Sequence, residues 1–283
     1  MTELRMPEAP LSWVPATLKK GEWLLPPPDG QPDEAWVGAV HGRLWQGTGF
    51  VLVPGLQLGG LTERQCVERC ARIVGQVCAP VGLRLQRSAG ELLTAATAPA
   101  VPRTPDTDAP ATPDGDDRLL LPHTDRGERP RPPRLLALLC IRPASEGGES
   151  LLASGPALRD HLATERPEAL RELSGDFRFG RGPDFDRVRP VFRLDGGTPR
   201  VHYNRYWIRR GQDETGTPFS PARADALDAM DALLHDPAVV LSLPLRRGDL
   251  LLVNNSAVLH GRNPFHDAGA PGGGRCYARI WAD

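Results

Sequence analysis

Short apolar runs, each bounded by Gly, Pro or Asp, fill most of the chain after residue 118 and limit the folds that it can adopt. They read "RLLLPHT", "PRLLALLCI", "ESLLAS", "PVFRLD", "PRVHYN", "VVLSLPL", "GDLLLVNN" and "RCYARIWA", and "GFVLVPG" (49–55) precedes them. Runs of this length and composition are typical of buried strands, and "LDGGTPRV" is typical of a hairpin. Many short strands with few helices predict a closed β-sandwich or jelly roll, so we expect a mainly β fold with flanking helices (α+β).

Helix signals occur in only a few segments between these runs. Thr62 and Gln65 form a T-x-x-Q capping box, and the apolar residues that follow recur at helical spacing. Three further helices are predicted from Ser154 to Ala163, from Pro167 to Leu173 and from Ser220 to His235. These helices are expected to flank the strands.

We expect residues 1–283 to form a single domain with two irregular parts. Residues 1–35 are rich in proline and carry tryptophans, which predicts an irregular N-terminal arm packed on the body. Residues 94–117, "TAATAPAVPRTPDTDAPATPDGDD", combine prolines, small residues and acids and predict a mobile flap. Because the flap ends just before the candidate site described below, we expect it to close over a bound molecule.

Charge and composition narrow the classes of partner. The formal net charge is -1, so bulk electrostatics do not indicate nucleic acid. The longest uninterrupted apolar run, Leu135 to Ile141, is too short to span a bilayer, and no secretory signal is visible. Five cysteines do not indicate a disulfide framework, so we expect a cytoplasmic protein without a membrane partner. Because only Lys19 and Lys20 are lysines, a cation in a binding site is expected to be arginine.

The segment "LLPHTDRGERP" (120–130) places His123 and Asp125 two residues apart at the end of an apolar run. Residues i and i+2 of a strand share a face, so both side chains are expected to project together. His260, in "LLVNNSAVLHGRNPF", follows another predicted strand and is the best candidate for a third ligand. Two histidines and one carboxylate form the facial triad of non-haem Fe(II) oxygenases. The alternative is that Asp125 pairs with a nearby arginine and that His260 is an ordinary loop histidine.

Two arginines and a hydroxyl occur at positions that strengthen the first interpretation. Arg275 lies fifteen residues after His260, in "GGGRCYARIWAD", and Arg279 is predicted on the same strand and the same face. A buried guanidinium that faces the metal can hold a carboxylate through two hydrogen bonds. Ser150, in "GGESLLAS", follows a glycine turn and offers a hydroxyl.

This order of motifs resembles the taurine/2,4-dichlorophenoxyacetate dioxygenase family of Fe(II)/2-oxoglutarate-dependent oxygenases. H-T-D, G-G-x-[ST]-x-x-A-S, a distal histidine and R-x-x-x-R follow one another from about Leu121 to Trp281. The resemblance implies a double-stranded β-helix, which is a cupin-like jelly roll. It also implies an enzyme that uses Fe(II), 2-oxoglutarate as co-substrate and O₂.

The resemblance further implies a role for each motif residue. The two histidines and the aspartate correspond to the iron ligands at the catalytic centre. Arg275 resembles the arginine that binds the distal carboxylate of 2-oxoglutarate. Ser150 stands where the family usually has a threonine that donates to the same carboxylate, so a hydroxyl is retained but the pattern departs from the family. Arg279 resembles the second arginine, which in sulfonate- or carboxylate-using members contacts the primary substrate.

Other candidate substrate contacts lie in "RVHYNRYWIRR" (200–210). His202, Asn204 and Arg205 are candidates for lining the substrate pocket, whereas Tyr203 is better explained as core. Two asparagines that precede the distal histidine are expected to support its loop through hydrogen bonds to the backbone. The arginines that follow the H-T-D motif, beginning with Arg126, are expected to form a solvated rim.

The expected activity is hydroxylation of an unactivated C–H bond in a small anionic or amino-acid-like molecule. The segment 132–150 and the long flap favour a role in antibiotic or other natural-product biosynthesis. Desaturation, cyclisation and epimerisation use the same cofactor chemistry and stay open. A metal-dependent hydrolase does not need Arg275 and Ser150, and a non-catalytic jelly-roll binding protein does not need an intact triad. Whether the chain forms a homo-oligomer, and whether its substrate is free or carrier-bound, is not determined by the sequence.

Overall fold

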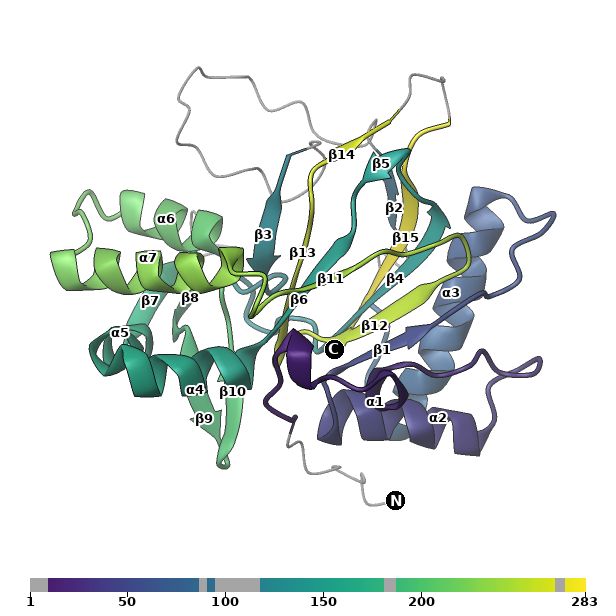
Figure 1. The fold of residues 1–283 in the computed structure, drawn as a ribbon, viewed down its shortest axis with the longest axis horizontal. Coiled ribbons are helices and arrows are strands. Elements are labelled where there is room, and N and C mark those ends of the chain that lie inside the picture. Colours follow the sequence, from purple (N-terminus) through teal and green to yellow (C-terminus); the bar gives the residue numbers. More distant parts are fainter. Residues whose placement is uncertain (1–9, 87–90, 95–117, 181–186, 268–272) are drawn as a thin grey trace.

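Two antiparallel sheets face each other at the centre of the computed structural model, which describes residues 10–86, 91–94, 118–180, 187–267 and 273–283 (Figure 1). The larger sheet has the order β1 (Phe50–Val53), β12 (Leu250–Asn254), β4 (Leu135–Arg142), β15 (Cys276–Ala282) and β2 (Glu91–Thr94). The smaller sheet has the order β11 (Leu241–Leu243), β6 (Ser150–Ser154), β13 (Val258–Arg262) and β3 (Leu120–His123). This arrangement confirms the predicted jelly roll.

Helices and two two-stranded ribbons lie outside the sheets, and a third ribbon, β5 (Glu146–Gly147) with β14 (Phe265–His266), lies at one end of them, at the top of Figure 1. The other two ribbons pair β7 (Asp176–Phe179) with β8 (Arg187–Pro190), and β9 (Phe192–Asp195) with β10 (Thr198–Val201). The α-helices are α1 (Lys20–Trp23), α2 (Glu34–His41), α3 (Glu63–Cys78), α4 (Gly155–Glu165), α5 (Pro167–Leu173), α6 (Arg205–Asp213) and α7 (Pro221–His235). Shorter helical turns are η1 (Pro15–Thr17), the π-helical η2 (Gly42–Gln46) and η3 (Ala79–Val81).

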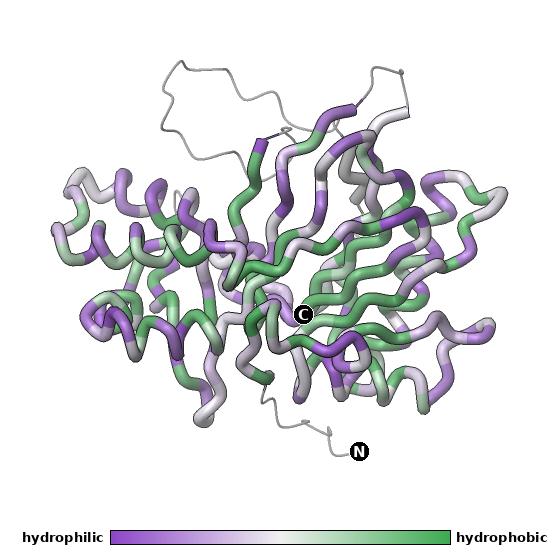
Figure 2. Tube along the Cα trace, viewed as in Figure 1, coloured by the Kyte–Doolittle hydropathy of each residue, from purple (hydrophilic) through white to green (hydrophobic). Residues whose placement is uncertain are grey.

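Strand alternation divides the buried apolar side chains into three layers. Along β12, Leu250 and Leu252 pack with α2 and α3, whereas Leu251 and Val253 face the smaller sheet. On the other side of the molecule, the outer face of the smaller sheet packs against α4, α5, α6 and α7. Figure 2 shows the resulting apolar strands at the centre of the fold. The layer between the sheets is therefore enclosed on both sides.

The same alternation directs the side chains of two predicted site residues, Arg279 and His260, into the layer between the sheets. Tyr277 and Trp281 on β15 belong to the cluster between the sheets, so Arg279, two residues from each, faces the same way. Val258 on β13 belongs to that cluster as well, and His260 shares its face. His260 and a cation, Arg279, are thus directed to one enclosed space.

Most predicted elements are confirmed, and the helical content is larger than expected. Helix α3 begins after Thr62, whose hydroxyl accepts from the Gln65 backbone N–H, and α4, α5 and α7 lie where helices were predicted. Helices α1, α2 and α6 were not predicted, and helix and strand take up about equal shares of the described residues. Helix α2 was missed because its N-cap, Asp33, which accepts from the Trp36 N–H, was assigned to the end of the irregular arm.

The arm and the flap were predicted from composition alone. Within the described part of the arm, Trp13 is buried and its Nε1 donates to the Thr48 carbonyl at 2.7 Å, while Trp23 stacks on Phe50. Thr94 is the last residue of β2, and the rest of the predicted flap, 95–117, lies outside the described residues. The flap and the single-domain organisation therefore stay predictions.

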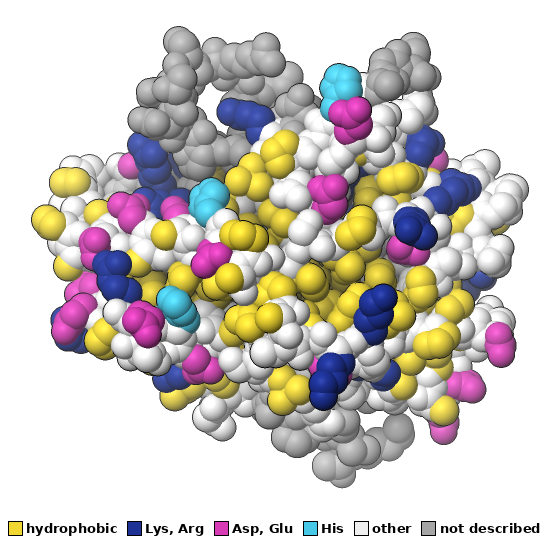
Figure 3. Space-filling model, viewed as in Figure 1, with side chains coloured by type: hydrophobic (Ala, Val, Ile, Leu, Met, Phe, Trp, Pro, Cys, Tyr) yellow, Lys and Arg dark blue, Asp and Glu magenta, His cyan; other side chains and the backbone are white. Residues whose placement is uncertain are grey.

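The helices, the cysteines and the surface charges of the structure agree with what the composition predicts. No helix in the described ranges is long and apolar enough to cross a membrane. All five cysteines are buried and unpaired, as expected for small core residues. On the face shown in Figure 3, positive and negative side chains are interspersed, so no field of one sign marks that face.

Candidate metal centre

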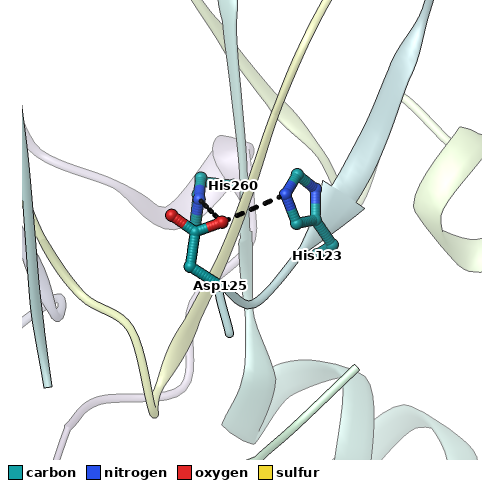
Figure 4. Close-up of side chains that lie close together, drawn as sticks. All are labelled: His123, Asp125 and His260. Atoms are coloured by element: carbon teal, nitrogen blue, oxygen red, sulfur yellow. Dashed lines mark ion pairs between the residues drawn. The ribbon is translucent and has the colours of Figure 1, made fainter. Parts of the chain in front are cut away.

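Three buried side chains converge between the two sheets (Figure 4). His123 is the last residue of β3, and the sheet register places His260 of β13 directly opposite it. The Asp125 Oδ1 atom lies 3.4 Å from His123 Nε2 and 3.5 Å from His260 Nε2. One potential ligand atom from each residue lies within 4.8 Å of the others. Two imidazoles and one carboxylate at this spacing suit a borderline divalent cation.

The electrostatics of the cluster favour binding of a cation. Burial by itself raises the pKa of Asp125, but His260, hydrogen bonds from both histidines and the nearby Arg279 hold that pKa well below its usual range. Burial lowers the pKa of His260 despite its carboxylate neighbour. The aspartate is therefore ionised, and an unprotonated His260 nitrogen is available to a metal.

Two details of this geometry differ from the prediction. Strand β3 ends at His123, so strand alternation does not bring Asp125 to the same face. Instead, the chain turns because the Thr124 N–H donates to the Tyr203 carbonyl at 2.7 Å and the Tyr203 N–H donates to Thr124 Oγ1 at 2.9 Å. His260, which was expected to lie beyond a strand, is the third residue of β13.

Asn255 fixes the turn that carries Asp125. Its Oδ1 accepts from the Asp125 N–H at 2.7 Å, and its Nδ2 donates to the Asp125 carbonyl at 3.0 Å and to the Pro133 carbonyl at 2.8 Å. Asparagine was predicted to support the loop before the distal histidine; Asn254 does so by accepting from the Ser256 N–H at 3.2 Å, whereas Asn255 holds the turn of Asp125. Asn254 does the same for η2, by donating to the Leu44 carbonyl at 3.1 Å.

Trp281 orients the aspartate and was not predicted as a site residue. Its Nε1 donates to Asp125 Oδ2 at 2.7 Å, which leaves Oδ1 directed at the two histidines. Its ring also lies against two guanidinium groups, that of Arg126 at 4.0 Å and that of Arg279 at 4.2 Å. The signal was present in the sequence, because Trp281 lies two residues after Arg279 on the same strand face.

Replacing Trp281 with phenylalanine is expected to weaken metal binding without removing a ligand. The change deletes the hydrogen bond to Asp125 Oδ2 and keeps most of the buried aromatic surface. Loss of an outer partner of a metal ligand typically costs about 10–100-fold in metal affinity or activity. Titration of the metal-free variant with Fe(II) under anaerobic conditions measures the effect. Trp23→Phe, an aromatic change in the arm, is the control, and equal affinities for both variants would contradict a role for Trp281.

Arg126 lies at the site and not on a solvated rim. Among the described residues other than glycine, it alone has a positive φ, 56°. This conformation is unfavourable for a long side chain and is found where the surrounding structure imposes it. Here it directs the guanidinium onto the Trp281 ring. The rim prediction holds only for Arg129 and Arg131, which are exposed.

Arg275 and Ser150 lie on two sides of a glycine turn. Arg275 immediately precedes β15, and its Nε is the nearest side-chain nitrogen to the position that a Cβ on Gly148 would take, at 3.7 Å. The guanidinium lies 4.0 Å from the Tyr277 ring, and its Nε is buried without a hydrogen-bond partner. Ser150 is buried at the start of β6. A buried guanidinium with an unused donor suits a ligand carboxylate, because an orphaned buried donor is unfavourable.

The candidate contacts in segment 200–210 have structural partners. Asn204 caps α6 by accepting from the Trp207 N–H at 3.2 Å. Arg205 donates to Asp228 at 2.8 Å on α7. Tyr203 is fully buried, as expected for a core residue. Contact of Asn204 or Arg205 with a substrate stays a prediction.

His202 differs from these neighbours because it is 6% exposed and its Nδ1 has no hydrogen-bond partner. Burial, together with Arg189, Arg193 and Arg200, lowers its pKa from 6.5 to about 3. Between these values the unfolded chain binds a proton that the folded chain excludes. The folded state therefore loses stability as the pH falls through this window, by up to about 5 kcal/mol.

Replacing His202 with glutamine is expected to remove this acid sensitivity. The free energy of unfolding of the wild type should fall more steeply than that of the variant between pH 6.5 and pH 3. Urea unfolding at a series of pH values measures the difference. His161→Gln, at an exposed position on α4, is the control. Parallel curves for wild type and His202→Gln would show that His202 is charged in the folded state.

Comparisons with known proteins agree with this geometry. The family described as "Taurine catabolism dioxygenase TauD, TfdA family" matches residues 21–281. A uridine-5'-phosphate dioxygenase from Streptomyces sp is 34% identical over 140 residues, which are 46% of this chain and 49% of the relative. The chain spans half or less of the length of the curated relatives that it matches.

Solved structures show the same fold at low sequence identity. A non-heme iron oxygenase, OrfP, in complex with Fe and alpha-ketoglutaric acid has a TM-score of 0.60 and 17% identity, over 88% of this chain and 80% of that one. An asparagine oxygenase in complex with Fe(II), 3-hydroxyasparagine and succinate has a TM-score of 0.59 and 18% identity, over 88% and 84%. The fold is the one that the strand pattern predicted. Since the family match extends over most of its length, this chain belongs to the TauD/TfdA family of dioxygenases.

Proposed function

We propose that the chain is an Fe(II)- and 2-oxoglutarate-dependent dioxygenase that hydroxylates an unactivated C–H bond of a small molecule. The observation that carries the proposal is the buried cluster of His123, Asp125 and His260, with its ionised carboxylate and an unprotonated imidazole nitrogen. These residues would hold the iron on one side and leave its other side to ligands. Membership of the TauD/TfdA family supports the same cofactors.

When bound, iron with 2-oxoglutarate and O₂ would supply an oxidant for C–H bonds, with one oxygen atom of O₂ ending in succinate beside the released CO₂ and the other in the product. The chain's own residues position these reactants and exclude water. Trp281 and Asn255 hold Asp125 in one orientation, and the enclosure between two sheets lowers the local dielectric.

Arg275 and Ser150 are proposed to hold the distal carboxylate of 2-oxoglutarate. The unpartnered Nε of Arg275 and the buried hydroxyl of Ser150 lie on two sides of the same glycine turn, away from bulk water. A guanidinium binds a carboxylate through parallel hydrogen bonds, and a neighbouring hydroxyl adds a third donor. This pair would keep the co-substrate in one orientation at the metal.

Arg279 is proposed to bind an acidic group of the primary substrate. Its side chain is 8% exposed and lies close enough to Asp125 and His260 to influence both electrostatically. It is therefore a cation beside the metal centre. An anionic or amino-acid-like substrate fits it, and relatives are named for uridine-5'-phosphate and for asparagine.

The test is formation of succinate by the purified protein with Fe(II), ascorbate, 2-oxoglutarate and a panel of small acids and amino acids. A substrate increases succinate above the uncoupled background, and mass spectrometry then identifies the reaction. Gain of one oxygen atom indicates hydroxylation, loss of two hydrogens indicates desaturation or cyclisation, and an unchanged mass indicates epimerisation. Product formation that does not depend on O₂ would instead support a metal-dependent hydrolase.

A further inference from the structure

A buried carboxylate that the proposed chemistry does not use lies on the turn after the H-T-D motif. Glu128 is 7% exposed, and its Oε2 is buried without a hydrogen-bond partner. Within the described ranges, the Glu128 carboxylate forms no ion pair. A buried acid without a partner is unfavourable, and native proteins retain one mainly where a ligand or an ion completes it.

The surrounding structure fixes Glu128 in this position. The neighbouring Gly127 packs so tightly that a Cβ there would approach the Phe179 ring at 3.2 Å. On the other side, the Arg189 guanidinium donates to the Arg129 carbonyl at 2.7 Å and so ties the turn to β8. Arg189 is close enough to influence Glu128 electrostatically but forms no ion pair with it. The carboxylate is thus held in place: burial raises its pKa, its own backbone N–H and the charges of Arg126 and Arg129 oppose that rise, and Oε2 keeps no hydrogen-bond partner.

Glu128 also lies beside the metal centre. It is three residues after Asp125, and the two carboxylates influence each other electrostatically. Two positive charges lie at Trp281, where the guanidinium groups of Arg126 and Arg279 pack against the indole ring. Two cations therefore lie at Trp281 beside the centre, and the turn that follows Asp125 carries a buried carboxylate.

We propose that Glu128 is the specificity residue that receives a cationic nitrogen of the primary substrate, an ammonium or a guanidinium group. The substrate class is accordingly a zwitterion, in which an acidic group faces Arg279 and the cationic nitrogen faces Glu128. An ammonium or guanidinium group supplies both the positive charge and the N–H donors that Oε2 lacks. A substrate that is purely anionic would place like charges together at Glu128. This inference rests on the proposed oxygenase function and specifies its substrate.

The test uses the anaerobic Fe(II)/2-oxoglutarate complex of the full chain, whose charge-transfer band changes when a substrate binds near the metal. The probes are L-arginine, L-ornithine, L-lysine and L-asparagine, each paired with its Nα-acetyl derivative, and uridine 5'-phosphate as an anion without a cationic nitrogen. We expect at least one free amino acid to change the band. Glu128→Gln should weaken its binding by about 10–100-fold, the loss typical of a hydrogen bond to a charged group. Glu165→Gln, the same change at an exposed position on α4, should leave it unaltered.

The same experiment separates this inference from the proposed function. If neither wild type nor Glu128→Gln develops the band with Fe(II) and 2-oxoglutarate, the cofactor assignment fails. If both develop it, but only compounds without a cationic nitrogen or no compound at all change the wild-type band, the role of Glu128 alone is overturned. Equal affinities of wild type and Glu128→Gln for an amino acid have the same consequence.

A stability measurement distinguishes a binding role from a structural one. A carboxylate retained for a ligand should not stabilise the substrate-free protein, so Glu128→Gln should leave the melting temperature unchanged or raise it by about 2 °C. A clearly lower melting temperature for Glu128→Gln than for Glu165→Gln would show that Glu128 supports the fold, and would overturn the proposal.

Discussion

Replacing His260 with alanine is expected to abolish iron binding and oxygenase activity together. The change removes one of three ligand atoms that lie within 4.8 Å of one another, and it leaves Asp125 and His123 to hold the metal alone. Loss of a direct ligand should exceed the roughly 10–100-fold effect of losing an outer partner. The measurements are the iron content of the purified protein, the charge-transfer band with 2-oxoglutarate, and succinate formation.

The control for this variant is His161→Ala, at an exposed position on α4. It removes a histidine that lies outside the cluster, so iron content and the band should equal those of the wild type. Circular dichroism of both variants verifies that the sheets are intact. If His260→Ala retained wild-type iron content and the band, the assignment of the cluster as the metal centre would be wrong.

The cluster itself could be predicted because its chemistry is local in sequence. H-T-D puts a histidine and a carboxylate two residues apart, and any short turn keeps such neighbours within reach of one metal. The reason given from the sequence was nevertheless incorrect, since Asp125 lies beyond β3. The turn depends on Tyr203 and Asn255, which are far along the chain and contact Thr124 and Asp125 only through the tertiary structure.

Residues that act through packing were harder to recognise. Trp281 could have been found, because alternation along β15 places it on the face of Arg279. Glu128 could not be found, because the feature that distinguishes it is a buried Oε2 without a hydrogen-bond partner. The local sequence does not indicate that such a partner is missing. Arg126 was assigned to a rim because nothing in the sequence indicated a positive φ at a residue other than glycine. Helix α6 was not predicted, because the mixture of aromatic and cationic residues in its segment indicated substrate contacts. Asn204, a candidate for such a contact, is the N-cap of this helix.

The second large effect is expected from Arg275→Ala, which should raise the 2-oxoglutarate requirement by about 10–100-fold and leave Fe(II) affinity nearly unchanged. The guanidinium has a buried Nε without a partner, so this donor is available to a ligand. A charge-assisted pair of this kind contributes roughly 1.5–3 kcal/mol. Titration of the anaerobic iron-loaded protein with 2-oxoglutarate measures the affinity directly.

Three further variants determine whether geometry or charge is responsible. Arg275→Lys keeps a cation but loses the planar fork, so its 2-oxoglutarate affinity should fall between those of the wild type and Arg275→Ala. Ser150→Ala removes one neutral donor and should have a weaker effect than either. Arg64→Ala, at an exposed position on α3, should change nothing. If Arg275→Ala bound 2-oxoglutarate like the wild type, the carboxylate would have to be held by Arg279. The cation proposed for the substrate would then belong to the co-substrate, and the zwitterion inferred from Glu128 would need its acidic group to face Arg126 instead.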